Sequence, residues 1–232
     1  QAKVLLIHRD GRIHSMLSPR AVLWDMDGVL ADTSQLHFET WESVLKEQGI
    51  PFDRQKFHLI YGLKNRDLLP FLAGKPYDPQ WMDWVADQKE LRFRQALPNH
   101  LSLLPGVQDW LERFHSWGWR QAVASSAPPE NVEALVDELK IRQYFQALVT
   151  PGDLPGKPDP AVFLLAASRL SMPPNHSMVI EDSIPGIEAA KSAGMHCIGV
   201  TTTNPPEVLT QADIVVASMA QLSIEQLEAL LR

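Results

Sequence analysis

The chain has 232 residues, of which 45% are hydrophobic and 21% are charged, and its formal net charge is −7. This length and composition are typical of a globular protein with one large domain, or with a core and a smaller insert. The acidic balance and the lack of a basic run argue against nucleic-acid binding, which needs a positive face. No apolar run approaches the roughly 20 residues that span a bilayer, so no membrane segment is expected.

The cysteine content favours a reducing compartment. Cys197 is the only cysteine in the chain and cannot form an internal disulfide. Residues 2–16 lack the apolar stretch of a signal peptide. We therefore expect a cytoplasmic protein in which Cys197 is a small buried residue on a strand rather than a nucleophile.

Residues 1–18 contain a pattern typical of a β-hairpin. Two short apolar runs, at residues 4–7 and 13–16, flank Asp10-Gly11. Asp-Gly is a strong signal for a tight hairpin turn. Because no chemistry is apparent in it, we expect this hairpin to be an accessory edge of the main fold.

Residues 21–33, AVLWDMDGVLADT, are the most informative segment of the chain. Four apolar residues run directly into Asp25 and Asp27, and Gly28 follows at once. The apolar run predicts a buried parallel strand, and ligands of open α/β sheets bind at the carboxyl ends of such strands. Two carboxylates this close repel each other unless a cation or a proton separates them. The pair therefore predicts a divalent metal or a shifted pKa, whereas the plainer alternative is a solvated polar turn.

From this segment onward, apolar strands alternate with amphipathic helices. Asp159-Pro160 predicts one helix start, with Asp at the N-cap and Pro at the first helical position, and Ser223 with Gln226 forms a capping-box pattern at another. The alternation predicts an α/β fold, with a Rossmann-like parallel sheet and helices on both faces. The expected strands are residues 21–25, 119–124, 145–149, 177–181, 196–200 and 213–216.

Residues 34–98 interrupt this alternation with helical patterns and no convincing strand. An insertion after the first strand would be an α-helical cap domain over the catalytic end of the sheet, where caps exclude water and read the substrate. The catalytic core would then consist of residues 1–33 and 99–232. The tryptophans are expected to fill the core of the cap rather than to stack on a ligand. The insertion carries two apolar stripes, formed by Phe38, Trp41 and Leu45, and by Trp81, Trp84, Val85 and Leu91.

Three later segments place polar residues at strand ends or in a loop. Ser125 and Ser126 follow an expected strand and precede a helix, where a hydroxyl and free N–H groups suit a phosphate, although a serine there is more often an N-cap. Lys157 lies in the loop GKPDP, where one glycine and two prolines restrain it more than most surface lysines. Glu181 and Asp182 form a second carboxylate pair at the end of an apolar strand.

In chain order, these segments resemble the four motifs of the haloacid dehalogenase superfamily, from about residue 21 to the end. The motifs are DMDGV, VASSA, GKPDP and EDSIPG. The resemblance implies that Asp25 is a nucleophile and that Asp27 is a general acid and base. It also implies that Ser125 and Lys157 contact the transferring phosphoryl group.

The fourth motif implies Mg²⁺ as the cofactor. Hard cations take oxygen ligands, and Mg²⁺ usually keeps some waters beside a few carboxylates. Asp25, the backbone carbonyl of Asp27, and Glu181 or Asp182 are the expected ligands.

Within this superfamily, residues 32–69 are most similar to the branch that contains β-phosphoglucomutase and small-sugar phosphatases. Thr33, His37 and Trp41 match the hinge and the first cap helix of that branch. Arg66, in GLKNRD, matches a cap loop in which an arginine meets the phosphate or acid group of the substrate. The expected substrate-binding residues are Gly28, Ser126, His37 and Arg66.

The implied reaction is Mg²⁺-dependent hydrolysis of a small phosphomonoester, such as a sugar phosphate, through an aspartyl-phosphate on Asp25. Asp27 would protonate the leaving alcohol and then activate water, and burial under the cap is expected to raise its pKa for this dual role. The expected partner is a small phosphorylated metabolite, with no nucleic acid and no membrane, and the protein is expected to be a monomer or a weak dimer.

Three other functions share parts of this pattern. A phosphomutase would share the whole core but would need a grip on a second phosphate, for which Pro128 and Pro129 offer no N–H donor. A dehalogenase would share the nucleophile without needing Asp27 or the Glu181-Asp182 pair. A receiver domain phosphorylated on aspartate would be a single small domain without a cap and would carry its carboxylates in a different order.

Overall fold

The computed structural model describes residues 20–60, 65–73, 78–98 and 101–231. The hairpin predicted within residues 1–18 lies outside the described residues, as do residues 62–64 of the predicted substrate loop. Arg66 belongs to a described helix, but its side chain is outside the described part of the structure.

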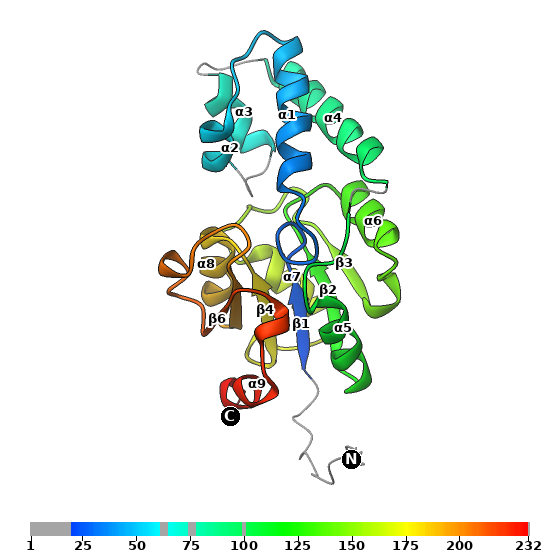
Figure 1. The fold of residues 1–232 in the computed structure, drawn as a ribbon, viewed down its shortest axis with the longest axis vertical. Coiled ribbons are helices and arrows are strands. Elements are labelled where there is room, and N and C mark those ends of the chain that lie inside the picture. The colour runs from blue at the N-terminus through cyan, green and yellow to red at the C-terminus, as the bar shows by residue number, and fades with distance from the viewer. Residues whose placement is uncertain (1–19, 61–64, 74–77, 99–100, 232) are drawn as a thin grey trace.

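Parallel strands form one sheet with the order β3-β2-β1-β4-β5-β6 (Figure 1). The apolar runs predicted these strands to within one or two residues. The first strand lies at the centre of the sheet, and its Trp24 is opposite Val123 on one side and Ile180 on the other. The residues that follow these three positions therefore meet at one edge of the sheet. The strands are β1 (Ala21–Trp24), β2 (Arg120–Ala124), β3 (Ala147–Val149), β4 (Ser177–Glu181), β5 (His196–Val200) and β6 (Ile214–Val216).

Helices cover both faces of the sheet, as the strand–helix alternation predicted. Successive residues of a strand point to opposite faces, so Trp24 packs in one apolar cluster and Leu23 in the other. The Trp24 face is covered by α5 (Val107–Ser116), α6 (Pro129–Glu138) and α9 (Ile224–Leu230). The Leu23 face is covered by α7 (Ala161–Arg169) and α8 (Ile184–Ser192). Short 3-10 helices occur at Arg142–Tyr144, Pro174–His176, Pro206–Val208 and Met219–Gln221.

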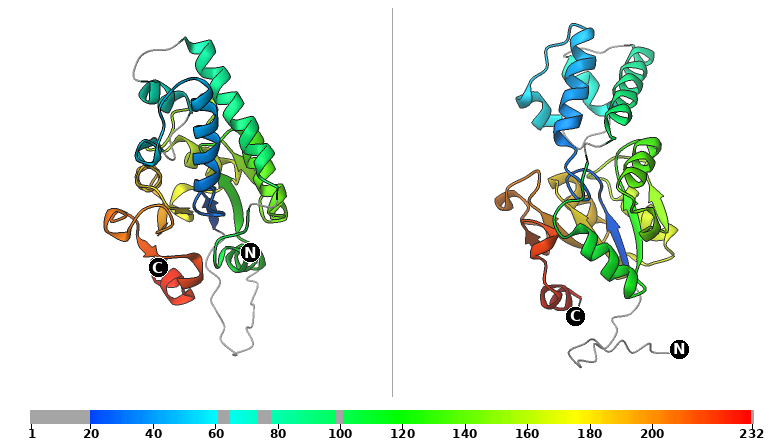
Figure 2. Two further views of the ribbon diagram at one scale, coloured as in Figure 1. Left: turned by 45° about the horizontal axis from the view of Figure 1, so that its top comes forward. Right: turned by 45° about the vertical axis from the view of Figure 1, so that its right-hand side comes forward.

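Between β1 and α5, the described residues form four helices, which stand beyond the carboxyl ends of the strands (Figures 1 and 2). They have an apolar core of their own, separate from the two clusters that cover the sheet. The predicted stripe of Phe38, Trp41 and Leu45 is buried in that core. The helices are α1 (Ser34–Glu47), α2 (Arg54–Ile60), α3 (Asn65–Ala73) and α4 (Pro79–Ala96).

The second stripe predicted for the insertion is wrong in part. Trp84 is 47% exposed and Leu91 is also exposed. The buried side of α4 instead follows Val85, Lys89 and Phe93, at i, i+4 and i+8. Trp81 and Val85 of the predicted stripe do pack in the core of the inserted helices, but a lysine rather than an apolar residue occupies the middle of the buried side.

Local capping residues agree closely with the sequence patterns. The predicted capping box of Ser223 and Gln226 is present at the start of α9. Helix α7 begins one residue later than predicted, because Pro160 is at its N-cap, although the Asp159 carboxylate still accepts a hydrogen bond from the Ala161 N–H. Cys197 is fully buried on β5, as expected, and burial raises the pKa of its thiol. None of the helices in the described ranges is both long and apolar enough to cross a membrane.

Candidate active site

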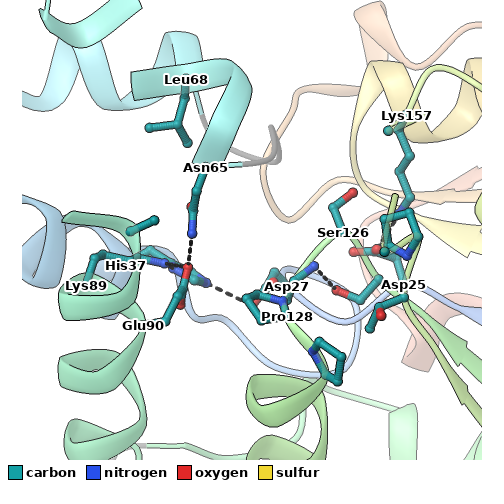
Figure 3. Close-up of a pocket in the computed structure, with 18 of the residues that line it drawn as sticks. Asp25, Asp27, His37, Asn65, Leu68, Lys89, Glu90, Ser126, Pro128 and Lys157 are labelled. Atoms are coloured by element: carbon teal, nitrogen blue, oxygen red, sulfur yellow. Dashed lines mark hydrogen bonds and ion pairs between the residues drawn. The ribbon is translucent and has the colours of Figure 1, made fainter. Parts of the chain in front are cut away.

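A cavity of about 530 Å³ lies between the carboxyl edge of the sheet and the inserted helices (Figure 3). Its walls come from both parts of the molecule, the strand ends below and α1 to α4 above. Gly28 is not among the described residues that line it. The cavity brings together Asp25, Asp27, His37, Ser125, Ser126, Lys157, Glu181 and Asp182.

Asp25 follows β1 and is paired with a lysine from the loop between β3 and α7. The Lys157 ammonium donates to Asp25 Oδ1 at 2.5 Å and to Glu181 Oε1 at 2.6 Å. Burial alone would lower the pKa of Lys157, but the charges of the two carboxylates outweigh it and raise that pKa. Lys157 is therefore a fixed cation beside the predicted nucleophile.

Glu181 holds this lysine because its own carboxylate is fixed by the start of the next helix. Its Oε2 accepts hydrogen bonds from the backbone N–H groups of Asp182 at 2.8 Å and Ser183 at 2.7 Å. Gly186, in the first turn of α8, leaves room for this carboxylate, since a Cβ there would lie 1.8 Å from Glu181 Oε1. Both Glu181 oxygens thus have protein partners, which favours Asp182 over Glu181 as a metal ligand.

Asp182 lies against the turn that follows Asp27. Thr203 donates its hydroxyl to Asp182 Oδ2, and the Asn204 amide donates to the Asp182 carbonyl at 3.0 Å. Gly28 has φ +79°, and a Cβ on it would be 2.0 Å from Asp182 Oδ2. Gly28 therefore permits the close approach of the first and fourth motifs, and this packing is its visible role.

The acidic groups at this edge carry more negative charge than Lys157 balances. Burial is the main cause that raises the pKa of Asp25 to about 7, and repulsion from Glu181 and Asp27 adds to it against the opposing charge of Lys157. Burial also raises the pKa of Asp182 well above its ordinary value, with repulsion from Glu181 and Asp25. A bound cation would relieve this repulsion, so the donor set suits a divalent metal.

The described carboxylates at the strand ends do not form a complete set of metal ligands by themselves. Among the described residues, no three acidic, imidazole or thiol groups stand together as a full ligand set. Mg²⁺ is usually held by one or two carboxylates together with water and substrate oxygens, and the carboxylates at this edge are donors of that kind.

Asp27 is held on the other side of the cavity by residues from the start of α1. The Thr33 hydroxyl donates to Asp27 Oδ1 at 2.5 Å, and His37 Nε2 lies 3.2 Å from the same oxygen. Burial opposes ionisation, but the His37 ring, the hydrogen bonds from His37 and Thr33, and the charge of Lys89 outweigh it and lower the pKa of Asp27. The expected rise in this pKa is therefore wrong, because the donors that the chain supplies to the carboxylate outweigh the penalty of burying its charge.

Two buried charged residues of this site escaped the sequence analysis. Lys89 and Glu90 on α4 are only 2% and 6% exposed, and both line the cavity. Lys89 donates to His37 Nδ1 at 2.8 Å and to Glu90 Oε1 at 2.9 Å. Figure 3 shows His37 between Asp27 and Lys89. The signal that points to Lys89 is its place between Val85 and Phe93 at helical spacing, which puts a cation on a buried face.

Ser125 and Ser126 take the positions expected from the end of β2. Ser125 is buried, its N–H donates to the Val149 carbonyl, and its hydroxyl accepts a hydrogen bond from the Ala127 N–H at 3.1 Å. Both serines line the cavity and follow β2, on the opposite side of β1 from Asp182. Their proposed contact with a phosphoryl group stays a prediction.

Comparison with known proteins places the chain in a family. The model of the haloacid dehalogenase-like hydrolases matches residues 22–200. The chain is 34% identical over 218 residues to a β-phosphoglucomutase from Bacillus subtilis (strain 168), covering 90% of this chain and 93% of that protein. It is 35% identical over 183 residues to a phosphorylated carbohydrates phosphatase from Thermotoga maritima, covering 77% and 83% of the two chains. The crystal structure of CbbY from Rhodobacter sphaeroides in complex with phosphate superposes with a TM-score of 0.82 at 26% identity, covering 90% of this chain and 99% of CbbY. The chain belongs to the haloacid dehalogenase-like hydrolases.

Proposed function

We propose that this protein is a Mg²⁺-dependent phosphatase that hydrolyses a small phosphomonoester, such as a sugar phosphate, through an aspartyl-phosphate intermediate. The observation that carries the proposal is the pairing of Asp25 with Lys157 at one wall of the cavity while Asp27 stands two residues away with its own donors. A nucleophile, a fixed cation and a separate acid–base group are the parts that phosphoryl transfer requires.

In the proposed reaction, Asp25 attacks phosphorus and the leaving alcohol departs on the side of Asp27. Asp27 donates a proton to the alcohol oxygen and later removes a proton from the attacking water. Lys157 and the Ser125 hydroxyl, which accepts from the Ala127 N–H and keeps its own hydrogen to donate, neutralise charge on the phosphoryl oxygens. Mg²⁺, when bound by Asp25, the Asp27 carbonyl and Asp182, would supply further neutralisation of that charge.

The inserted helices act as a cap in this proposal. Residues 34–98 form the cap domain, and residues 1–33 and 99–232 form the catalytic core. Closing a cap excludes water and completes the site around the substrate. His37 and Arg66 are retained as proposed substrate contacts, and Ser126 and Gly28 belong to the core side of the same proposal.

The relatives include both a mutase and a phosphatase, so the choice depends on this chain's own residues. A mutase must grip a second phosphate while it transfers the first. Ala127, Pro128 and Pro129 line the cavity after Ser126, and neither proline has an N–H to donate. The nearby Asn131 amide is already occupied by Glu90 and Arg94. These features favour hydrolysis over mutase activity.

A turnover screen over small phosphomonoesters, with and without Mg²⁺, tests the proposal. We expect release of inorganic phosphate that stops on chelation and returns with Mg²⁺. Interconversion of hexose 1- and 6-phosphates, followed by NMR with a bisphosphate activator, should be absent. Isomerisation well above the rate of phosphate release would instead identify a mutase, and metal-independent turnover would favour a dehalogenase-type site.

A further inference from the structure

The last turns of α4 are joined to the core by a polar contact that the proposed chemistry does not use. Figures 1 and 2 show this end of α4 beside α6. Asn131, fully buried on α6, donates from Nδ2 to Glu90 Oε2 at 2.5 Å. Arg94, one turn after Glu90, donates from Nη1 to Asn131 Oδ1 at 2.7 Å. We call this contact the Glu90–Asn131–Arg94 bridge.

The direction of each hydrogen bond in the bridge is fixed by chemistry. A guanidinium can only donate, and an ionised carboxylate can only accept. The Asn131 amide must therefore present its oxygen to Arg94 and its NH₂ group to Glu90. Burial opposes ionisation of Glu90, but the charge of Lys89 and hydrogen bonds from Asn65 and Lys89 lower its pKa and keep it an acceptor.

The same carboxylate continues the chain of hydrogen bonds toward Asp27. Glu90 Oε1 accepts from Lys89 Nζ at 2.9 Å and from Asn65 Nδ2 at 2.6 Å (Figure 3). Because the Lys89 ammonium can only donate, His37 Nδ1 must accept from it, and His37 Nε2 carries the hydrogen that faces Asp27. The donor order therefore runs from Lys89 through His37 to Asp27.

Packing alone does not explain this network. Burying charged groups is costly, and apolar residues of similar size would usually stabilise a small helical core as well or better. The Lys89 ammonium also lies 5.1 Å from the Phe93 ring centre and 5.4 Å from that of Trp41, so aromatic faces enclose it. His37 stacks on Phe93 with ring centres 4.2 Å apart, which fixes the plane of its imidazole.

We propose that Glu90 and Asn131 are positioning residues: the bridge fixes α4 on the core, and through Lys89 and His37 it orients Asp27 for proton transfer to the leaving group. This role rests on the proposed phosphatase reaction. Neither residue touches the reacting atoms. Their effect should therefore follow the demand of a substrate for a proton, and not its binding alone.

The first experiment compares two esters with the variant Glu90→Gln. Glycerol 2-phosphate has an alkoxide leaving group that needs a proton, whereas p-nitrophenolate leaves without one. We expect kcat/KM for glycerol 2-phosphate to fall at least about tenfold further than kcat/KM for p-nitrophenyl phosphate, which is part of the roughly 10²–10⁴-fold that general acid catalysis contributes. Equal losses for the two esters would overturn the positioning role.

The second experiment exchanges the hydrogen-bond polarity of the bridge. Glu90→Gln places two NH₂ groups face to face, and turning either amide moves the mismatch to Lys89 or Arg94. Asn131→Asp places two buried carboxylates face to face. The double variant restores every donor–acceptor pair across the bridge, because the introduced amide on α4 would donate to the introduced carboxylate on α6, and Arg94 would still donate to that carboxylate. We expect the double variant to regain most of the Tm and most of the glycerol 2-phosphate activity lost in the single variants.

A matched control lies on the exposed side of the same helix. Glu47 pairs with Arg92 of α4 at 2.6 Å, so Glu47→Gln also removes a carboxylate partner of α4. It should leave both kcat/KM values unchanged.

The Tm and kcat/KM measurements separate failure of the bridge from failure of the proposed reaction. Additive Tm losses in the double variant would overturn the bridge whatever the activity. If the wild-type protein hydrolyses neither ester, nor any other phosphomonoester in the screen, the proposed function fails and the positioning role fails with it. The Tm measurements still decide in that case whether the bridge joins α4 to α6.

Discussion

Asp25 is expected to destabilise the metal-free protein while it serves as the proposed nucleophile. Its carboxyl group is buried beside Glu181 and Asp27, and its pKa rises from 3.8 to about 7. Between pH 3.8 and about 7, the folded protein keeps the Asp25 proton, whereas the unfolded chain has lost it. The free energy of unfolding therefore falls as the pH rises through this range. Asp25→Asn removes the titration and keeps the shape of the side chain.

The change in the free energy of unfolding follows from the shift in the pKa of Asp25. From 3.8 to about 7 is roughly three pH units, and each unit corresponds to about 1.4 kcal/mol. Ionised Asp25 therefore costs the fold up to about 4 kcal/mol above pH 7, an upper value because Asn also gives up the ionic contact with Lys157. For a chain of this length about 1 kcal/mol moves Tm by about 2–4 °C, so the variant should gain several degrees.

Thermal unfolding of both proteins in EDTA, at pH 4, 6 and 8, measures this effect. The Tm difference should be near zero at pH 4, where the folded wild type keeps its proton, and largest at pH 8. Added Mg²⁺ should raise the Tm of the wild type more than that of the variant, because the variant lacks one proposed ligand. An Asp25→Asn variant that is no more stable than the wild type at pH 8 in EDTA would refute the reasoning.

Three further substitutions test the site and the cap. Lys157→Met leaves two buried carboxylates without their cation and should lower the unfolding free energy in urea by about 3–5 kcal/mol, and a loss below about 1 kcal/mol would show that the lysine is not an essential counter-charge. Gly28→Ala adds a Cβ 2.0 Å from Asp182 Oδ2 at a residue with φ +79°. It should destabilise the fold by more than about 1 kcal/mol and raise the Mg²⁺ concentration needed for half-maximal activity. An unchanged Mg²⁺ titration would contradict the close approach of the first and fourth motifs. Val85→Ala should cost about 2 kcal/mol in chemical denaturation and Trp84→Ala less than about 0.5, and the reverse order would mean that the buried side of α4 is misassigned.

Much of this architecture could be predicted from local pattern alone. The apolar run before Asp25 can only be buried, so it predicts a central strand, and a parallel sheet then brings the ends of neighbouring strands to one edge. Ser125 and the Glu181-Asp182 pair follow two such strands, which places them beside Asp25 without any knowledge of side-chain geometry. The helical insertion was equally visible, because no strand pattern interrupts residues 34–98.

The sequence by itself determined that its four motifs meet at one edge of the sheet, and the tertiary structure decided what each motif residue does there. Glu181 and Asp182 are both carboxylates, and the sequence does not distinguish their roles. The start of α8 turns Glu181 toward Lys157 and leaves Asp182 against Gly28. From the sequence alone, Lys89 would be assigned to the surface, because only the folded structure brings its neighbours on α4 and α1 around it. The pKa of Asp27 moves down rather than up for the same reason: ionisation depends on the balance between burial and the donors that distant segments supply, and that balance exists only in the folded chain.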